Sequence, residues 1–417
     1  MRNSPFWWIF LGFMLLIDLY FFQAVRVLTH SAGPRTRLWI HSGYWILSVA
    51  AILMLILLPY LHIDKQARLA KSTLFSMIAG IFIAKLIASL FFLIDDLRRG
   101  LQWAGTRLFP SSREVGAAAL AGEGITRSAF LSWAGMLAGS GLFGTLIYGF
   151  GNKHRYQVKR LKLNYPNLPE AFRGTKIIHI SDIHSGSFTD KEAVMKGVQK
   201  ILHERPDLIL FTGDLVNNTA PEMEDYMDVF DKLEAPMGVY STLGNHDYGD
   251  YVHWDSPEQK AENLERLKQV HAELGWRLLM NEHVVLEKGG QQIALLGIEN
   301  WSAKARFPKY GDLQRAHTGT DNYTFKILMS HDPSHWRAEV MEKYPDIDLM
   351  LAGHTHGMQF GVEIPGLKWS PVQYVYNEWA GLYEKDRQKL YVNRGFGFIG
   401  YPGRVGILPE ITLIELV

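Results

Sequence analysis

Residues 176–186 read KIIHISDIHSG, an apolar run that ends in a carboxylate and an imidazole. The same arrangement returns as LILFTGD at 208–214, VYSTLGNHD at 239–247, KILMSH at 326–331 and LMLAGHTH at 349–356. Short runs rich in Ile, Val and Leu, with polar residues directly after them, are typical of buried strands in an α/β sandwich. Such sheets place their sites where the strands end. The sequence therefore predicts an α/β domain with a polar site at one sheet edge.

The rest of the C-terminal half alternates between strand-like and helix-like segments. Residues 190–204 and 257–274 have the pattern of covering helices, the first with Thr189 or Asp190 as its N-cap. The predicted strands are Lys176–Ser181, Leu208–Thr212, Val239–Leu243, Ile293–Ile298, Lys326–Ser330, Leu349–Ala352 and Leu390–Asn393.

The side chains after these strands form a ligand set for two divalent metals that share a carboxylate. A metal pair of this kind stabilises both oxygens of an in-line displacement at phosphorus. The chain has no cysteine, so thiolate sites are excluded and any metal must use N and O ligands. The candidate metal ligands are Asp182, His184, Asp214, Asn245, His331, His354 and His356.

Composition limits the other classes of function. The 417 residues are too many for one typical domain. The formal net charge is +1, so the basic excess expected of a nucleic-acid-binding protein is absent. We expect no nucleic-acid partner.

The N-terminal part is predicted to be a membrane anchor, residues 1–150, followed by a linker at 151–162 and a catalytic domain at 163–417. Each of four apolar stretches has about the 20 residues needed to cross a bilayer. Between the third and fourth stretches, Asp96–Phe109 is predicted to form an amphipathic helix in the interface, or else a solvated loop. The four stretches are Phe6–Val25, Leu38–Leu61, Leu74–Ile94 and Ala129–Phe150.

Two ionisable residues, Asp18 and Lys85, fall inside these stretches at similar depth. Charges in a bilayer are costly and are usually paired or functional. We expect a structural ion pair between the first and third helices. A role in transport is the alternative.

The distribution of basic residues gives a weak indication of orientation. The two loops on one side carry more arginine and lysine than the N-terminus and the second loop, which favours an extracytoplasmic C-terminal domain. The basic residues 153–162 oppose that orientation. We expect an integral protein of a bacterial inner membrane.

The motifs resemble those of the calcineurin-like metallophosphoesterase superfamily, and in particular its membrane-attached bacterial branch. The resemblance covers about residues 163–417 and every metal-binding motif. GDLVNN (213–218), GNHDY (244–248), AGHTHG (352–357), YVNRGFG (391–397) and LPEITLIEL (408–416) carry it. One departure is Met358, where the branch commonly has glycine. The resemblance implies a four-helix transmembrane segment followed by a metallophosphoesterase sandwich, with two central β-sheets flanked by helices.

The resemblance also implies a role for each residue. The implied metals are two divalent ions, and the ligand chemistry suits Mn, Fe or Zn. One is held by Asp182, His184, Asp214 and His356. The second is held by Asp214, Asn245, His331 and His354, so that Asp214 bridges. His246 is left without a metal and is expected to protonate the leaving oxygen. Asp247 is expected to orient His246, and Arg394 to bind a phosphate oxygen.

Several substrates are compatible with this site. The aromatic-rich segment Phe360–Tyr383 can contact lipid, which favours a phosphodiester or pyrophosphate bond in a phospholipid or glycolipid. The resemblance suggests UDP-2,3-diacylglucosamine, of lipid A biosynthesis, although that substrate faces the cytoplasm. The alternatives are a broad-specificity phosphomonoesterase, a cyclic-nucleotide phosphodiesterase, or a transporter or sensor with a phosphoesterase output.

Overall fold

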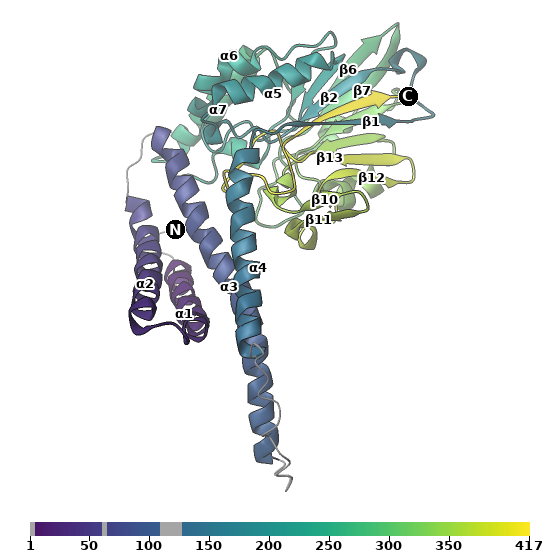
Figure 1. Cartoon of the computed structure of the whole chain (residues 1–417). Helices are drawn as coiled ribbons and strands as arrows, with labels where there is room; N and C mark the ends of the chain where they lie inside the picture. The colour runs from purple at the N-terminus through teal and green to yellow at the C-terminus, as the bar shows by residue number, and fades with distance from the viewer. Residues whose placement is uncertain (1–4, 61–64, 109–126) are drawn as a thin grey trace. The chain divides into compact units, whose positions relative to one another are not determined.

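The computed structural model describes residues 5–60, 65–108 and 127–417. The chain divides into two compact units, Met1–Tyr148 and Gly149–Val417. Figure 1 shows helices alone in the first unit, and two sheets with their covering helices in the second. The predicted fold class, a helical membrane segment followed by an α/β sandwich, is confirmed.

The described residues of the first unit contain four helices that are each long and apolar enough to cross a membrane. They are α1 (Pro5–Leu28), α2 (Pro34–Leu57), α3 (Lys65–Leu108) and α4 (Arg127–Gly149). Leu61, where the second stretch was predicted to end, lies outside the described residues.

The third helix differs from the prediction because it runs without interruption over 44 residues. The described part of Asp96–Phe109 is therefore neither a separate interfacial helix nor a loop. Ion pairs one turn apart, Asp95 with Arg98 at 2.9 Å and Asp96 with Arg99, support the helix where its apolar stretch ends. The apolar stretch of the sequence therefore ends here, whereas the helix continues.

Two kinds of contact hold the helices of the first unit together. Leu11, Met14, Leu55, Ile78 and Phe82 form a buried apolar cluster between α1, α2 and α3. The predicted ion pair is also present, since Lys85 Nζ lies 2.6 Å from Asp18 Oδ1 and donates to Ser48 Oγ at 2.8 Å. The pairing and the hydrogen bond to Ser48 offset part of the cost of placing these charges among apolar helices.

Glycines let α4 pack closely on α3. A Cβ atom at Gly139 would lie 2.6 Å from the Ala84 carbonyl oxygen, and one at Gly135 would lie 2.8 Å from the Ala88 carbonyl oxygen. Glycines four residues apart on one face are a common device for close packing of membrane helices.

The second unit is a sandwich of two six-stranded sheets, with strand orders β1-β14-β2-β3-β4-β5 and β12-β13-β9-β8-β7-β6, and a separate β10–β11 hairpin. The strands of the first sheet are β1 (Gln157–Leu163), β2 (Lys176–Ile180), β3 (Leu208–Phe211), β4 (Val239–Ser241), β5 (Arg277–Leu278) and β14 (Glu410–Leu416). The others are β6 (Glu282–Lys288), β7 (Gln291–Gly297), β8 (Lys326–Met329), β9 (Leu349–Ala352), β10 (Val362–Ile364), β11 (Leu367–Trp369), β12 (Gly381–Lys385) and β13 (Gln388–Val392).

Alternating side chains of each buried strand enter different layers of the core. Ile177 of β2 packs between the sheets with Ile327 and Leu349, whereas Ile178 and Ile180 face the helices on the outer side. Helices α5 (Lys191–His203), α6 (Met227–Phe230) and α7 (Pro257–Glu273) cover the first sheet (Figure 1). The short helices α8 (Leu313–His317) and α9 (Met341–Lys343) lie on the side of the second.

The predicted linker 151–162 is wrong in part, because it contains most of a strand. β1 pairs in parallel with β14 along its full length, from Gln157 with Glu410 to Leu163 with Leu416. Lys159, Arg160 and Lys162 make the segment polar, so a search for apolar runs does not find this strand. An edge strand tolerates such charges because one of its sides remains in solvent.

Candidate metal centre

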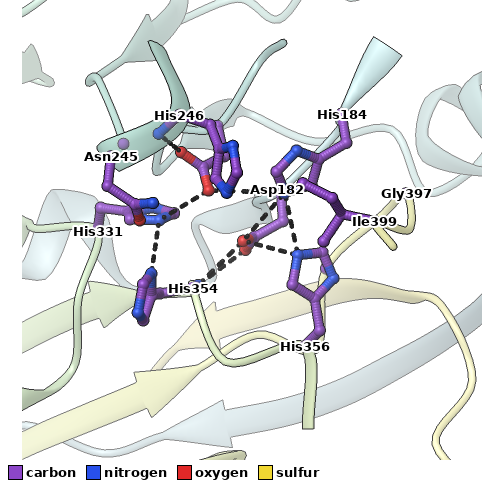
Figure 2. A network of polar contacts seen from close by, with 12 residues as sticks. Asp182, His184, Asn245, His246, His331, His354, His356, Gly397 and Ile399 are labelled. Atoms are coloured by element: carbon purple, nitrogen blue, oxygen red, sulfur yellow. Dashed lines mark hydrogen bonds and ion pairs between the residues drawn. The ribbon is translucent and has the colours of Figure 1, made fainter. Parts of the chain in front are cut away.

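The seven predicted ligands converge at the ends of five strands. Asp182 and His184 follow β2, Asp214 follows β3 and Asn245 follows β4, which are neighbours in the first sheet. The other ligands follow β8 and β9, which are neighbours in the second. Figure 2 shows Asn245, His331 and His354 on one side, His184 and His356 on the other, and Asp182 between them.

The backbone at the ligands is strained. Five of the seven ligands have positive φ angles of 49° to 69°: Asp182, His184, Asp214, His354 and His356. Residues with a Cβ rarely adopt this left-handed conformation, and clusters of it occur at functional sites. Glycines allow the turns to fit, since a Cβ at Gly353 would overlap Ser181 Oγ and Asp182 Oδ2. The sheet edge is thus shaped to aim these side chains inward.

The first ligand group consists of Asp182, His184 and His356, all buried. His356 Nε2 lies 3.2 Å from Asp182 Oδ1 and 3.1 Å from His184 Nε2. The ligand atoms of the group lie within 4.8 Å of one another, which is close enough to share one cation.

The second group consists of Asp214, His331 and His354, within the same limit of 4.8 Å. His331 Nε2 lies 3.2 Å from Asp214 Oδ2 and 3.3 Å from His354 Nδ1. Asp214 Oδ2 also lies 3.5 Å from His184 Nε2 in the first group. Of the ligands, Asp214 is therefore placed to face both groups.

Asn245 adds an oxygen beside the second group. Its amide nitrogen donates to the Tyr251 hydroxyl at 2.8 Å, and that bond fixes which way the amide points. Asn245 Oδ1 is buried and has no hydrogen-bond partner among the described residues. Buried oxygens without a partner are rare and require an explanation, such as an ion.

Hydrogen bonds on the outer side of the rings test whether metals fit. The Nδ1–H of His331 donates to the Thr212 carbonyl at 2.7 Å, so in the neutral ring the lone pair is on Nε2. The Tyr376 hydroxyl donates to Asp332 at 3.1 Å and therefore accepts from His354 Nε2–H at 2.9 Å, which leaves a lone pair on His354 Nδ1. Two lone pairs and a carboxylate that face one another require a positive charge between them. The residues fit a bound cation.

Electrostatics of the metal-free protein lead to the same conclusion. Burial lowers the pKa of His331, but the Asp214 and Asp182 carboxylates outweigh burial and raise the pKa to about 10. Burial raises the pKa of Asp214, but the His331 and His246 imidazoles outweigh burial and hold this pKa well below its usual value. The carboxylate thus stays ionised and attracts a proton to His331, a role that a divalent cation takes over when it binds.

His246 lies at the rim of the site and is held by a contact that the sequence did not indicate. Its Nδ1–H donates to the Asn217 carbonyl at 2.7 Å, so its Nε2 is free to face the pocket. The Tyr251 ring lies against the imidazole with a centroid distance of 4.5 Å.

Asp247 does not orient His246 as predicted. Its two carboxylate oxygens accept backbone N–H groups of Asp214, Leu215 and Gly244, each at 2.8 Å. The chain turn after β4 places the carboxylate beneath the loop after β3, away from the imidazole. Asp247 therefore joins two ligand loops.

Arg394 was predicted to bind a phosphate oxygen, but the structure places its guanidinium in ion pairs with Glu410 and, at 2.7 Å, with Glu363. It is buried and does not line the pocket above the described ligands. Its guanidinium therefore binds carboxylates of the protein itself.

Five of the seven predicted ligands line a cavity of about 580 Å³: His184, Asp214, Asn245, His354 and His356. Arg306 is the basic residue of its lining, and Tyr251, Phe307 and Tyr376 contribute aromatic rings. The remaining lining is largely apolar: Met358, Pro371, Val372, Val375 and Ile399. The site can hold a phosphoryl group at the ligands together with an apolar group beside it.

Comparison with protein families yields two matches, one over the first unit and one within the second. Residues 1–153 match the "Probable Calcineurin-like phosphoesterase, transmembrane domain", and residues 175–358 match the calcineurin-like phosphoesterases. The second match contains all seven predicted ligands.

Individual relatives match part of the chain. The uncharacterized metallophosphoesterase YkuE of Bacillus subtilis is 30% identical over 293 residues, 66% of this chain and 95% of that protein. The "Transmembrane protein with metallophosphoesterase domain" of Danio rerio is 28% identical over 65% of this chain, which spans 60% of its length. The UDP-2,3-diacylglucosamine pyrophosphatase LpxG of Chlamydia muridarum is 26% identical over 58% of this chain and 83% of that protein.

Proposed function

Because the chain belongs to the calcineurin-like metallophosphoesterases, we propose that it is a membrane-anchored hydrolase of a phosphodiester or pyrophosphate bond in a phospholipid or glycolipid. The observation that supports this substrate class is the pocket. It is lined both by candidate ligands and by apolar residues such as Met358, Val372 and Val375. An amphiphile whose phosphoryl group lies next to its apolar part fits that division.

The proposed cofactors are two divalent ions, Mn, Fe or Zn, since imidazole and carboxylate ligands suit all of them. Asp182, His184, Asp214 and His356 would hold one, and Asp214, Asn245, His331 and His354 would hold the other. Such ions would supply positive charge to a phosphoryl transition state and would make water a better nucleophile. Asp214 would belong to both sets, because its Oδ2 lies 3.5 Å from His184 Nε2 and 3.2 Å from His331 Nε2.

His246 acts as the general acid. The Asn217 carbonyl accepts its Nδ1–H and so orients the ring, while Nε2 directs a proton into the pocket. Arg306, which also lines the pocket, contacts a phosphoryl or diphosphate oxygen. Tyr251 keeps the His246 ring in place.

One specific substrate is UDP-2,3-diacylglucosamine, because a relative bears the name of its pyrophosphatase. The test is a screen of the purified full chain with Mn²⁺ against this compound, other lipid phosphodiesters and soluble esters. We expect faster hydrolysis of lipid substrates. Asp214→Asn should abolish turnover and reduce the metal content. Two tightly bound ions and intact turnover in this variant would contradict the two-metal assignment.

The side of the membrane distinguishes the candidate substrates. We propose a bacterial inner membrane with an extracytoplasmic catalytic unit, on the basis of the basic loops. The chain has no cysteine, so Asp386→Cys, at a side chain that is 83% exposed, gives a single label site. Labelling by an impermeant maleimide in intact spheroplasts is expected. Labelling only after lysis would place the unit in the cytoplasm and favour the UDP-linked substrate.

A further inference from the structure

The β10–β11 hairpin turns polar side chains toward the domain and apolar side chains toward the outside. Its paired polar residues, Glu363 and Lys368, turn toward the domain: Glu363 bonds Arg394 at 2.7 Å and Lys368 donates to the Ala380 carbonyl. Its apolar residues are outside, with Val362, Ile364 and Leu367 exposed by 39%, 57% and 51%. A hairpin on a soluble surface normally presents the opposite alternation. The outer face is therefore adapted to apolar surroundings.

The apolar surface continues to the mouth of the catalytic pocket. Met358, Tyr374 and Val375 are exposed by 57%, 78% and 51%, and Met358 and Val375 line the pocket. Ser370 Oγ donates to the Gly357 carbonyl at 2.8 Å, which joins the two chain segments that carry these residues. We call the surface of Met358, Val362, Ile364, Leu367, Tyr374 and Val375 the interfacial patch.

The C-terminal end of the last apolar span is hydrogen-bonded to a segment near the interfacial patch. That span extends to Asn152, so its final residues belong to the second unit. The Gly149 carbonyl accepts Arg404 N–H at 2.9 Å, and Asn152 Nδ2 donates to the Arg404 carbonyl at 3.2 Å.

The next residue, Val405, links this end of the span to the patch. Its N–H donates to the Gln359 carbonyl at 2.8 Å, and its carbonyl accepts Gly361 N–H at 2.9 Å. Gln359 and Gly361 lie between Met358 and Val362 of the patch. The end of a membrane span is thus held within a few residues of the patch by hydrogen bonds inside one unit.

From these observations we infer that the interfacial patch docks onto the lipid surface of the bilayer and opens the catalytic pocket toward the leaflet. Apolar side chains at such a surface gain burial. Lys153 and Arg155, which follow the span, provide charge complementary to lipid phosphates. The docking does not depend on which ester is cleaved, whereas its effect on catalysis rests on the proposed lipid substrate.

The first test measures depth. Because the chain lacks cysteine, Ile364→Cys can carry a single fluorophore in the full chain, reconstituted in phosphatidylcholine–phosphatidylglycerol vesicles with nitroxide-labelled lipids. Val285→Cys on β6, which is 40% exposed, is the matched control. We expect strong quenching at residue 364 and little at residue 285. Equal quenching at the two positions would overturn the inference.

The second test measures the catalytic effect. The double variant Ile364→Glu with Leu367→Glu should raise the apparent KM for a vesicle-embedded phosphodiester by about tenfold, because two apolar contacts are lost. Hydrolysis of soluble bis(p-nitrophenyl) phosphate should not change, and Val285→Glu should change neither. An unchanged KM for the lipid would contradict the inference. If no lipid ester is cleaved by any variant, the substrate proposal fails while the quenching result still decides the docking.

Discussion

At the scale of single residues, the site depends on side chains that hold the ligands as much as on the ligands. Asp247 bonds the backbone of two ligand loops, and Tyr376 bonds both His354 and Asp332. Partners of this kind orient metal ligands and set their tautomers. The ligands could be predicted because each follows an apolar strand. Tyr376 and Asn217 could not, because they come from loops without periodic pattern.

Tyr376→Phe should weaken metal binding by about 10–100-fold, the usual effect of losing such a partner. The hydroxyl is the group that fixes the lone pair of His354 on Nδ1. Calorimetric titration of the metal-free full chain with Mn²⁺ measures the effect. Tyr374→Phe, at a ring in the same segment that is 78% exposed, is the control. Equal affinities of the two variants would refute the role of Tyr376.

His246→Ala should retain both metals and slow turnover by about 10²–10⁴, the range for losing general acid help. The loss should be smaller for esters of nitrophenol, which need no protonation on departure. Rates on a series of leaving groups, with metal analysis, check this. His253→Ala, at an exposed histidine, should behave as the native chain. A loss that is independent of the leaving group counts against the acid role.

At the scale of elements, sequence patterns located most strands and all four membrane helices but misjudged two boundaries. β1 was assigned to a linker because its lysines and arginine obscure its alternation, and it becomes a strand only through β14. α3 was ended too early because its charged residues pair along the helix. Both errors arise where tertiary or local pairing outweighs hydropathy.

Gly139→Ala should destabilise the packing of α4 on α3, because the new methyl group would meet the Ala84 carbonyl. Overpacking of this kind costs about 1–3 kcal/mol. Gly141→Ala in the same helix is the control, since no atom lies within 4 Å of its Cβ position. Thermal unfolding of the full chain in detergent should show a lower Tm for Gly139→Ala alone. Equal Tm values would show that the contact is not tight.

At the scale of the whole molecule, each unit has its own core, and the membrane unit is stabilised by a buried ion pair. The pair lies among apolar helices, whereas the candidate ligands belong to the other unit. The fold class was accessible from the sequence because these two kinds of core differ so strongly in composition. The substrate was not, because the pocket walls come from loops whose contacts no spacing reveals.

Asp18→Ala and Lys85→Ala should each lower the Tm of the full chain more than the double variant does. Each single change leaves an unpaired charge in apolar surroundings, and the second change removes it. The rate of folded protein on a soluble ester should not change. Strictly additive losses would show that the pair is not coupled, and a selective loss on lipid substrate would revive a coupled role of the helices.

The position of β14 has a consequence for biosynthesis. This strand follows all the other strands of the sandwich in the sequence, yet it lies between β1 and β2, so the first sheet is completed only after all of those strands have been synthesised. During translation β1 waits as an unpaired segment, and Lys159, Arg160 and Lys162 discourage its association with other nascent chains. Loss of β14 would leave β1 without a strand to pair with, even though every candidate ligand precedes β14 in the sequence.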